Sequence, residues 1–410
     1  MPSICFYFQV HQPYRLCNYN FFEMGQDVDY FDTPKNIEVL NKVAEKCYLP
    51  ANATFLRLIK KYKGDFKIAY SISGVALEQF ETWRPDVLDS FKQLVDTGCV
   101  EILAETYHHS LSYLYSKEEF LHQVKKHERK VQELFGVTPT VFRNTELIYN
   151  NDIAHFIKNE GYKGIIAEGV EWLLGYKTPN FIHHPPGAHD FPVLLKNYKL
   201  SDDIAFRFSN KQWVEHPLSA EKFANWAHQI AGNGDTVNLF MDYETFGEHQ
   251  WADTGIFDFL EHLPAFIFRH PDFTFNTPSE VIDKYAIKGE YNVPNISSWA
   301  DTERDLSAWR SNEMQYEALR RIYKLETAIK ASKDSRLVKD WRRMTTSDHF
   351  YYMCTKYWSD GDVHKYFSPY DTPLEAYNNF INACGDIEYR LSQTTSRLIQ
   401  YKISEENFVL

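Results

Sequence analysis

The sequence predicts an α/β fold, in which a β/α barrel is followed by a helical bundle. Two observations carry this prediction. Short apolar runs alternate with helical stretches over the first 290 residues, and several of these runs end directly in polar side chains. In barrels and open α/β sheets the functional side chains lie at the carboxyl ends of the strands. We therefore expect a barrel over residues 1–290 and a helical domain over residues 291–410.

The candidate strands are short apolar runs bounded by turn-forming residues. The clearest is V-N-L-F-M-D-Y-E-T-F-G-E-H-Q-W, residues 237–251, because its apolar part breaks abruptly into acids, aromatics and a glycine. Proline cannot continue a central strand, so His11 and Gln12 lie where the first run ends, just before Pro13. The seven candidates span residues 4–10, 66–71, 100–104, 140–143, 164–167, 203–208 and 237–241, and residues 274–277 add a short extra strand.

Several helices are marked by their own capping signals. Residues 116–119 and 277–280 each fit a capping box, and residues 372–375 place a proline directly after an N-cap threonine. The helix that starts at residue 117 is expected to stop at Gly136. Beyond Tyr285 the apolar positions of residues 319–329 keep helical spacing, which predicts a packed helical domain without repeats.

Composition excludes several classes of function. A formal net charge of -12 argues against a nucleic-acid partner, which would need clustered Lys and Arg. The six cysteines are widely spaced without a C-x-x-C pair, so we expect reduced thiols. No basic leader precedes the first apolar run, and no run approaches a membrane span, so we expect a cytoplasmic protein without a membrane partner. The aromatic share of 16% provides the side chains that a sugar-binding cleft needs.

Polar residues that follow the strands are expected to converge at one rim. They are His11, Glu105, His109, Glu146, Glu168 and Asp242. A buried structural histidine is an equal alternative for His11 taken alone. The loop H-H-P-P-G-A-H-D, within residues 181–192, suggests a lid or brace. Surface histidines in proline-rich loops are commoner than metal ligands, so we predict no metal there.

Five motifs occur in order at the predicted strand ends and in the helical part. They are H-Q-P-Y (11–14), E-T-Y-H-H (105–109), F-R-N-T-E-L-I-Y (142–149), M-D-Y-E-T-F-G (241–247) and T-S-D-H-F-Y-Y-M (346–353). With these motifs the chain resembles glycoside hydrolase family 57 over nearly its whole length, and it looks most similar to the α-amylase-like members.

The resemblance implies an irregular (β/α)7 barrel with a helical domain that completes the active-site cleft. It implies action on α-1,4-glucans with retention at the anomeric carbon and without a cofactor. The family's nucleophile falls on Glu146 and its general acid/base on Asp242. The resemblance also implies substrate-binding roles for His11, Gln12, Glu105, His109, Trp251, Trp299, Asp348, His349 and Tyr352. His108 stands where a tyrosine looks more usual, so the choice between His108 and His109 stays open, and a polar seam between domains is the alternative for the residues of the helical part.

The chemistry supports the pair of carboxylates independently. A retaining glycosidase needs two carboxyl groups about 5 to 5.5 Å apart, one ionised to attack and one protonated to release the leaving oxygen. Arg143 is close to Glu146 in sequence and favours the ionised form, whereas the apolar residues before Asp242 favour a protonated one. The two strands must face across the rim or meet through a distorted closure of the barrel. Strand alternation places Glu244 on the same face as Asp242, so periodicity alone leaves Glu244 as a rival for the acid.

Three other functions compete with hydrolysis. A 4-α-glucanotransferase would use the same carboxylates, with a sugar hydroxyl in place of water. A metal-dependent polysaccharide deacetylase would need clustered Asp and His ligands, and the histidines here are not spaced in that way. A non-catalytic glucan-binding protein would need neither carboxylate.

Overall fold

The computed structural model describes residues 2–356 and 368–406, with side chains as far as residue 393. The chain divides into two compact units. The first unit contains Met1–Gln12, Ile37–Tyr107 and His122–Ala300, and the second contains Pro13–Asn36, His108–Leu121 and Asp301–Leu410. The predicted domains, residues 1–290 and 291–410, stay a prediction; in this division into compact units the first unit extends to Ala300, and two segments from the N-terminal part of the chain belong to the second unit.

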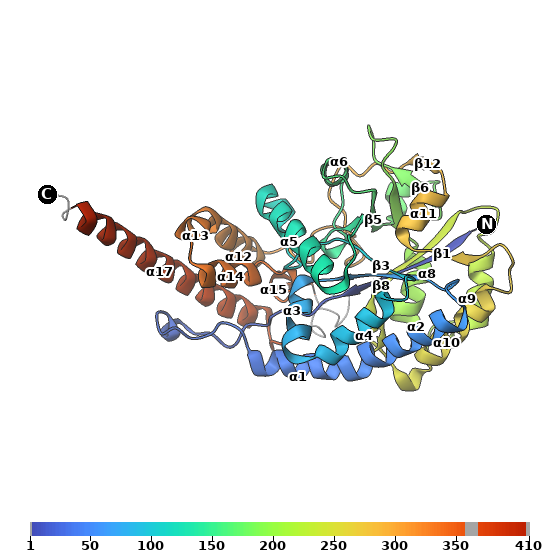
Figure 1. Cartoon of the computed structure of the whole chain (residues 1–410), viewed down its shortest axis with the longest axis horizontal. Coiled ribbons are helices and arrows are strands. Elements are labelled where there is room, and N and C mark those ends of the chain that lie inside the picture. Colours follow the sequence, from blue (N-terminus) through green and yellow to red (C-terminus); the bar gives the residue numbers. More distant parts are fainter. Residues whose placement is uncertain (1, 357–367, 407–410) are drawn as a thin grey trace. The chain divides into compact units, whose positions relative to one another are not determined.

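The first unit is built around a ring of parallel strands (Figure 1). Neighbouring strands pair in the order β8-β1-β2-β3 and β4-β5-β7. The predicted seven-stranded (β/α) barrel is confirmed. Within the described residues the ring consists of β1 (Ser3–Val10), β2 (Ile68–Ile72), β3 (Val100–Ile102), β4 (Val141–Arg143), β5 (Gly164–Glu168), β7 (Val193–Lys196) and β8 (Thr236–Asp242).

Two short seams close the ring and make the barrel irregular. Between β3 and β4, the backbone of Ala104 donates to Val141 O over 3.0 Å and accepts from Arg143 N over 2.8 Å. Between β7 and β8, Asn197 N donates to Asn238 O over 2.9 Å. The strands β4 and β8 consequently face each other across the ring, with β5 and β7 between them on one side and β1 to β3 on the other.

Strand alternation separates the inside of the barrel from the outside. Successive side chains of a strand point to opposite faces. On β1, Phe6 and Phe8 belong to the large apolar cluster that joins the strands to the surrounding helices. Cys5 and Tyr7 belong to a second cluster inside the barrel, together with Phe240 of β8. The apolar runs recognised in the sequence are therefore buried on both faces, as expected for a parallel sheet.

Helices follow the strands and cover the outside of the ring (Figure 1). Two of them, α1 (Thr33–Val43) and α5 (Lys117–Phe135), contain residues of both units. The predicted end of α5 is confirmed, because Gly136 follows it with a φ of 70° that glycine adopts without strain. The others are α2 (Leu49–Lys61), α3 (Gly74–Trp83), α4 (Pro85–Val95), α6 (Asn151–Asn159), α7 (Glu171–Leu174), α8 (Tyr198–Asp202), α9 (Ala220–His228), α10 (Ile256–Ile267) and α11 (Pro278–Lys284).

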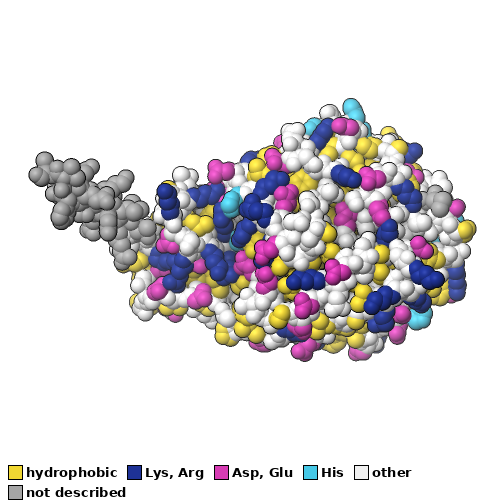
Figure 2. All heavy atoms as spheres, in the orientation of Figure 1, with side chains coloured by type: hydrophobic (Ala, Val, Ile, Leu, Met, Phe, Trp, Pro, Cys, Tyr) yellow, Lys and Arg dark blue, Asp and Glu magenta, His cyan; other side chains and the backbone are white. Residues whose placement is uncertain are grey.

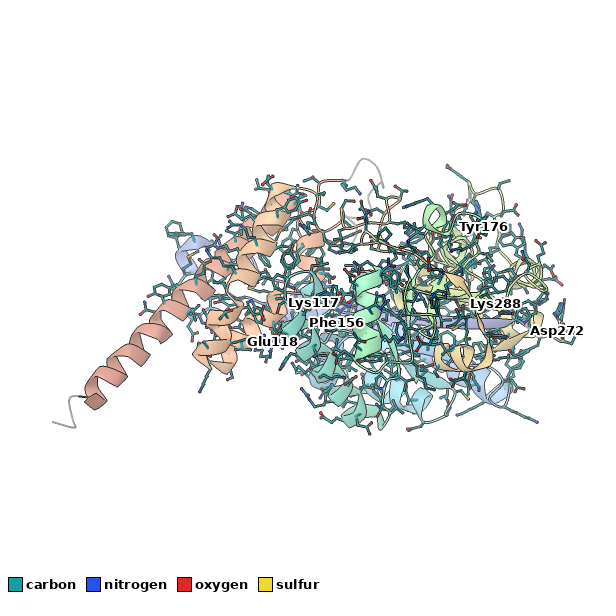
Figure 3. The ribbon with its side chains drawn as sticks, turned by 90° about the horizontal axis from the view of Figure 1, so that it is seen from above. Lys117, Glu118, Phe156, Tyr176, Asp272 and Lys288 are labelled. Atoms are coloured by element: carbon teal, nitrogen blue, oxygen red, sulfur yellow. The ribbon has the colours of Figure 1, made fainter. Side chains whose placement is uncertain are left out.

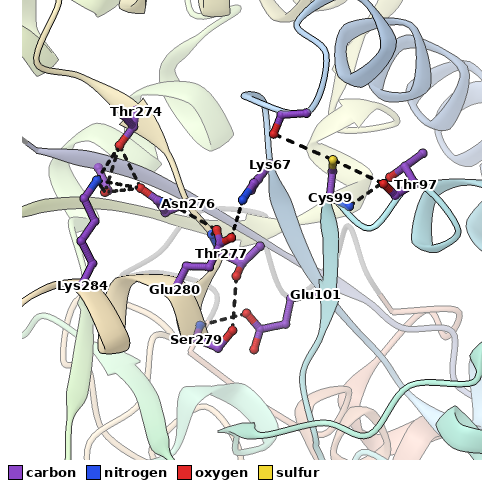
Figure 4. A network of polar contacts seen from close by, with 12 residues as sticks. Lys67, Thr97, Cys99, Glu101, Thr274, Asn276, Thr277, Ser279, Glu280 and Lys284 are labelled. Atoms are coloured by element: carbon purple, nitrogen blue, oxygen red, sulfur yellow. Dashed lines mark hydrogen bonds and ion pairs between the residues drawn. The ribbon is translucent and has the colours of Figure 1, made fainter.

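A polar network closes the amino-terminal end of the barrel (Figure 4). The predicted capping box at the start of α11 is present, with Glu280 accepting from Thr277 N over 3.0 Å. Glu280 also pairs with Lys67. Ser279 N donates to Glu101 Oε2 of β3 over 2.9 Å. Because this network ties α11 to β3 and to the chain before β2, it stabilises the end of the barrel opposite the polar strand ends.

One predicted strand is wrong. Residues 203–208 form a helical turn, Asp203–Arg207, directly after α8, and the sixth strand of the ring is β7. An i,i+4 contact of helical spacing accompanies this turn: Arg207 Nε donates to Asp203 Oδ1 over 2.6 Å, which favours the helical conformation over a strand. Phe206 is 61% exposed, whereas every residue of β7 is buried.

The remaining strands lie outside the ring. β11 (Thr274–Phe275) pairs in parallel with the first residues of β1. It is the short extra strand that the sequence predicts at residues 274–277. The His- and Pro-rich loop contains β6. Tyr176, which follows α7, is 97% exposed and lies at the periphery of the molecule in Figure 3. The other short strands are β6 (Ile182–His184), β9 (Phe246–Gly247), β10 (Gln250–Trp251) and β12 (Ile287–Glu290).

The second unit is helical, as predicted. Its apolar positions at helical spacing, Leu319, Ile322, Tyr323 and Ile329, are all buried. Two of its bonds join distant parts of the sequence: Tyr30 donates to Asp386, and Thr346 Oγ1 donates to His108 O over 2.9 Å. Its helices are α12 (Glu313–Lys324), α13 (Glu326–Ser332), α14 (Ser335–Met344), α15 (Ser347–Tyr351) and α17 (Pro373–Glu406).

Candidate active site

The carboxyl ends of the seven strands carry a layer of inward-facing polar side chains. On each strand this residue lies two positions beyond an apolar residue of the interior cluster, so alternation turns it to the same face. On this face of each strand, an apolar residue is therefore followed two positions later by a polar or charged one. The layer consists of Gln9, Ser71, Glu105, Arg143, Glu168, Lys196 and Asp242.

Gln9 connects three strands in this layer. Its Oε1 accepts from the hydroxyls of Tyr7 and Ser71, each over 2.9 Å, and its Nε2 donates to Glu105 Oε1 over 3.2 Å. In the β1/β8 register Gln9 is paired with Asp242. The side-chain amide of Gln9 therefore connects β1, β2 and Glu105, which follows β3, within this layer.

Charged groups from several strand ends act on the buried hydroxyl of Tyr7. Burial raises the pKa of its hydroxyl, the positive charge of Arg143 opposes this shift, and the negative charges of Glu105 and Asp242 add to it. Three charged groups from three separate strand ends thus act on one buried hydroxyl. Because the hydroxyl stays protonated, it remains the donor that orients Gln9.

Arg143 is a buried cation at the centre of this layer. It is fully buried, and among the described residues none accepts a hydrogen bond from its guanidinium nitrogens. Glu105, also fully buried, lies 3.9 Å from Arg143 Nη1, and the ring of Trp299 lies 5.1 Å from Cζ. A buried charge without hydrogen bonds is costly, so its surroundings must supply negative potential. The carboxylates and the indole face supply it here.

Glu146 stands on a strained turn just after β4. Its φ of 57° and ψ of 26° lie in the left-handed region, which costs a non-glycine residue about 1 kcal/mol or more. The turn is fixed by Asn144, whose Oδ1 accepts from Thr145 N over 3.0 Å and whose Nδ2 donates to Ile148 O over 3.0 Å. The half-buried Glu146 carboxylate accepts from Trp299 Nε1 over 2.9 Å.

Lys196 supplies a second buried cation. Its Nζ lies 3.4 Å from Glu168 Oε2 and 3.0 Å from Asp202 Oδ1, and it lies 5.7 Å from the ring of Trp299. The register pairs Lys196 of β7 with Glu168 of β5. Arg143 and Lys196 therefore both face the indole that binds Glu146.

Asp242 and Glu244 differ in their surroundings. β8 ends at Asp242, and the chain then enters a 3-10 turn, Tyr243–Thr245, so strand alternation does not continue to Glu244. Glu244 is buried and binds the Tyr48 hydroxyl and Gln12 Nε2. Burial, with the negative charge of Asp242, raises the pKa of Glu244 to about 8. Asp242 is only half-buried.

Comparison with known proteins identifies the family of this chain. The profile of glycosyl hydrolase family 57 matches residues 5–294, which include the ring except the first two residues of β1. The chain belongs to glycosyl hydrolase family 57. The predicted family and the prediction of an enzyme are thereby confirmed.

The relatives of this family-57 chain include archaeal enzymes. A Methanocaldococcus jannaschii protein, provisionally named as an alpha-amylase, is 45% identical over 407 residues, which are 96% of this chain and 86% of that protein. A branching enzyme of family 57 from Thermococcus kodakaraensis has the same fold, with a TM-score of 0.70 at 14% identity over 99% of this chain and 93% of its own. The 4-alpha-glucanotransferase of Thermococcus litoralis gives 0.58 at 17% identity over 93% of this chain and 59% of its own.

The predicted site residues of this family-57 chain fall in both units. In the first unit, His11 binds Ser73 Oγ through Nδ1 over 2.7 Å, and Gln12 Nε2 donates to the Tyr48 hydroxyl over 3.1 Å. Trp251 is 58% exposed. The contacts described above join Trp299 to Glu146 and, through Arg143, to Glu105, while Asp242 is paired with Gln9 in the strand register. The first unit also holds His11, Gln12 and Trp251.

Four predicted residues belong to the second unit. They are His109, Asp348, His349 and Tyr352. His349 is buried, and its ring packs on Phe380 while Nε2 lies 3.2 Å from Arg343 O. Burial, followed by the negative charge of Asp348, raises the pKa of Tyr352. His109 O accepts from Ser347 N over 2.9 Å, so the motif around Asp348 is tied to the E-T-Y-H-H motif.

Sequence reasoning missed three members of the inward layer. Gln9, Ser71 and Lys196 were not singled out. A signal existed for Lys196, because Val193, Leu194 and Leu195 form an apolar run that ends in a charge. For Gln9 and Ser71 the signal was the alternation of apolar and polar residues within β1 and β2.

The described residues contain no group of three or more His, Cys, Asp or Glu side chains arranged to hold a metal ion. A deacetylase would require such a group. None of the helices in the described ranges combines the length and apolar character needed to cross a membrane. On the face seen in Figure 2, basic and acidic side chains are interspersed, without the basic stripe that nucleic-acid binding needs.

The raised pKa of Glu244 leads to a prediction for stability. Its pKa is about 8 in the folded protein against an ordinary 4.5, so between these values the folded state holds a proton that the unfolded chain has lost. The stabilisation is complete below pH 4.5 and decreases as pH rises towards 8, by at most about 1.4 kcal/mol per pH unit. Glu244→Gln should abolish this dependence.

The measurement is the free energy of unfolding by denaturant between pH 5 and pH 9. The difference between wild type and Glu244→Gln should shift in favour of the variant as pH rises. Glu171→Gln, at an exposed position on α7, is the control and should follow the wild-type curve. Parallel curves for wild type and Glu244→Gln would contradict the prediction.

Proposed function

We propose that this chain is a retaining, α-amylase-like glycosidase that cleaves α-1,4-glucosidic bonds in starch, glycogen or maltooligosaccharides. Glu146 is the nucleophile and Asp242 the general acid/base. The observation that carries the proposal is the arrangement of half-buried Glu146 and half-buried Asp242 at the carboxyl ends of facing strands, above one connected layer of charged groups. Membership of the family supplies the reaction class.

The proposed reaction has two steps. Glu146 attacks the anomeric carbon while Asp242 gives its proton to the departing glycosidic oxygen, which forms a covalent glycosyl ester and frees the first product. Asp242, now ionised, then takes a proton from water, whose oxygen attacks the anomeric carbon and releases Glu146. Two inversions leave the α-configuration. If a sugar hydroxyl replaces water in the second step, the same residues perform transglycosylation.

The surroundings suit these roles. Glu146 accepts the indole N–H of Trp299, whose ring faces the two buried cations Arg143 and Lys196, and such partners favour the ionised carboxylate. Asp242 lies beside Glu244 and is paired with Gln9 in the β1/β8 register. The part played by His109, Asp348, His349 and Tyr352 in binding the sugar remains a prediction of the resemblance.

The test is incubation with maltoheptaose, followed by NMR of the anomer first formed and by separation of the products. We expect new reducing ends with the α-anomer first, and shorter oligosaccharides. Products longer than maltoheptaose with a constant number of reducing ends would indicate the 4-α-glucanotransferase. The β-anomer appearing first would refute retention. A metal-dependent deacetylase would leave maltoheptaose, which carries no acetyl group, uncleaved.

A further inference from the structure

The segment around Trp299 is attached to the chain that carries Glu146. Tyr149 N donates to Ser297 O over 2.9 Å, and Ser297 N donates to Tyr149 O over 2.8 Å. Two residues further on, Trp299 N lies 3.3 Å from Glu146 O, and Trp299 Nε1 lies 2.9 Å from Glu146 Oε2. One residue thus donates to both the main chain and the side chain of Glu146, 153 positions away in sequence.

These bonds matter because the conformation of Glu146 is strained. A left-handed residue that is not glycine persists only where neighbouring structure holds it. Asn144 restrains the turn from the segment that contains Glu146 itself. Trp299 restrains it from the second segment, which pairs with the first through the bridge between Tyr149 and Ser297. Without Trp299, the carboxylate would lose its orienting donor, and the turn would lose one of its restraints.

The indole of Trp299 also faces two cations. Arg143 Cζ lies 5.1 Å and Lys196 Nζ 5.7 Å from the ring centroid, both within the range of cation–π attraction. Positive charge on the ring face withdraws electron density, which makes the N–H a stronger donor to a carboxylate. Each of these cations also lies beside carboxylates. Glu105 lies beside Arg143, and Glu168 and Asp202 lie beside Lys196.

We propose that Trp299 is a positioning residue for Glu146, which transmits the charge of the buried Arg143 and Lys196 to that carboxylate and fixes its orientation. This role differs from the substrate-binding role that the resemblance implies, and it rests on the proposed function. An indole that stacks on a sugar contributes its ring face to binding. An indole that positions Glu146 contributes its N–H to the attacking step.

Trp299→Phe separates the two roles, because it keeps an aromatic ring and removes the N–H. We expect kcat on maltoheptaose to fall about tenfold to a hundredfold, the loss typical of a hydrogen bond to a charged group, while KM changes little. The acidic limb of the kcat/KM profile should move to higher pH by about one unit, because the ionised carboxylate loses a donor. Trp299→His, which restores an N–H, should recover part of both effects.

The matched control is Trp172→Phe, at a position on α7 that is 62% exposed and outside the site. It should leave kcat and the acidic limb unchanged. A second measurement follows covalent labelling by 5-fluoro-α-maltosyl fluoride with mass spectrometry, which reports the attacking step alone. The labelling rate of Trp299→Phe should fall with its kcat, and circular dichroism and thermal unfolding should verify that the variant folds.

The outcomes separate this inference from the proposed function. If wild type is labelled at Glu146, and Trp299→Phe is labelled at the same rate with an unmoved acidic limb, the positioning role is refuted while the nucleophile stands. A raised KM with unchanged kcat in Trp299→Phe would assign the ring to sugar binding instead. If wild type is not labelled at Glu146, the proposed function itself fails.

Discussion

Replacing Glu146 with glutamine should reduce kcat/KM for maltoheptaose by on the order of 10⁴-fold or more, the scale found when an enzyme loses its nucleophile. Glutamine has the shape of glutamate and can still accept a hydrogen bond from Trp299 Nε1, so the site should remain assembled. What it lacks is the negative oxygen that attacks the anomeric carbon. The expected loss is therefore in kcat, measured as release of reducing ends, with KM largely retained.

A rescue experiment identifies the role of Glu146 rather than its importance alone. Glu146→Ala leaves room for azide beside the anomeric carbon of α-maltosyl fluoride, whose fluoride leaves readily. Azide should attack directly and restore turnover, and a single inversion should yield β-maltosyl azide. Glu171→Gln, an exposed acid outside the site, is the control and should behave as wild type without azide. Normal turnover by Glu146→Gln would remove Glu146 from the mechanism.

The sequence predicted the barrel because its strands are local features. Parallel strands covered on both faces are continuous apolar runs, and the polar residues that follow them mark one rim. The positions of Glu146 and Asp242 at facing strand ends follow from this pattern and the order of strands. Their roles came from the resemblance, and they stay predictions until the variants are measured.

The errors have physical causes in particular residues. Residues 203–208 are mostly apolar, like a short strand, but the contact between Asp203 and Arg207 has helical spacing. The strand β7 has only four residues beside a proline-rich loop, which concealed it. The division into two compact units depends on contacts between distant residues, such as Tyr30 with Asp386, that no local pattern encodes.

The contact of Trp299 with Glu146 was unpredictable for the same reason. The resemblance suggested Trp299 as part of a sugar subsite, whereas the structure adds two bonds to Glu146 and two facing cations. The strained φ of Glu146 also has no sequence signal, since glutamate rarely adopts it. The strained conformation of Glu146 is restrained by the nearby Asn144 and by Trp299 from a distant part of the chain.

Replacing Asp242 with asparagine should separate proton transfer from nucleophilic attack. We expect kcat/KM for maltoheptaose to fall by about 10²- to 10⁴-fold, the usual contribution of general acid–base catalysis. The loss on α-maltosyl fluoride should be much smaller, because fluoride departs without a proton. The measurement is the ratio of the two activities, together with the basic limb of the pH profile, which should disappear in Asp242→Asn.

Azide gives the second half of this test with the opposite stereochemistry. Asp242→Asn keeps Glu146, so azide should intercept the covalent intermediate and yield α-maltosyl azide after two inversions, not the β-product expected of Glu146→Ala. Glu244→Gln is the matched comparison, because Glu244 is the neighbouring acid and is bound by Tyr48 and Gln12. If Glu244→Gln rather than Asp242→Asn became selective for the fluoride, Glu244 would be the acid. The contrast is decisive because both variants change a carboxyl group to an amide within three residues of chain, yet only one of them should remove the proton that the leaving sugar needs.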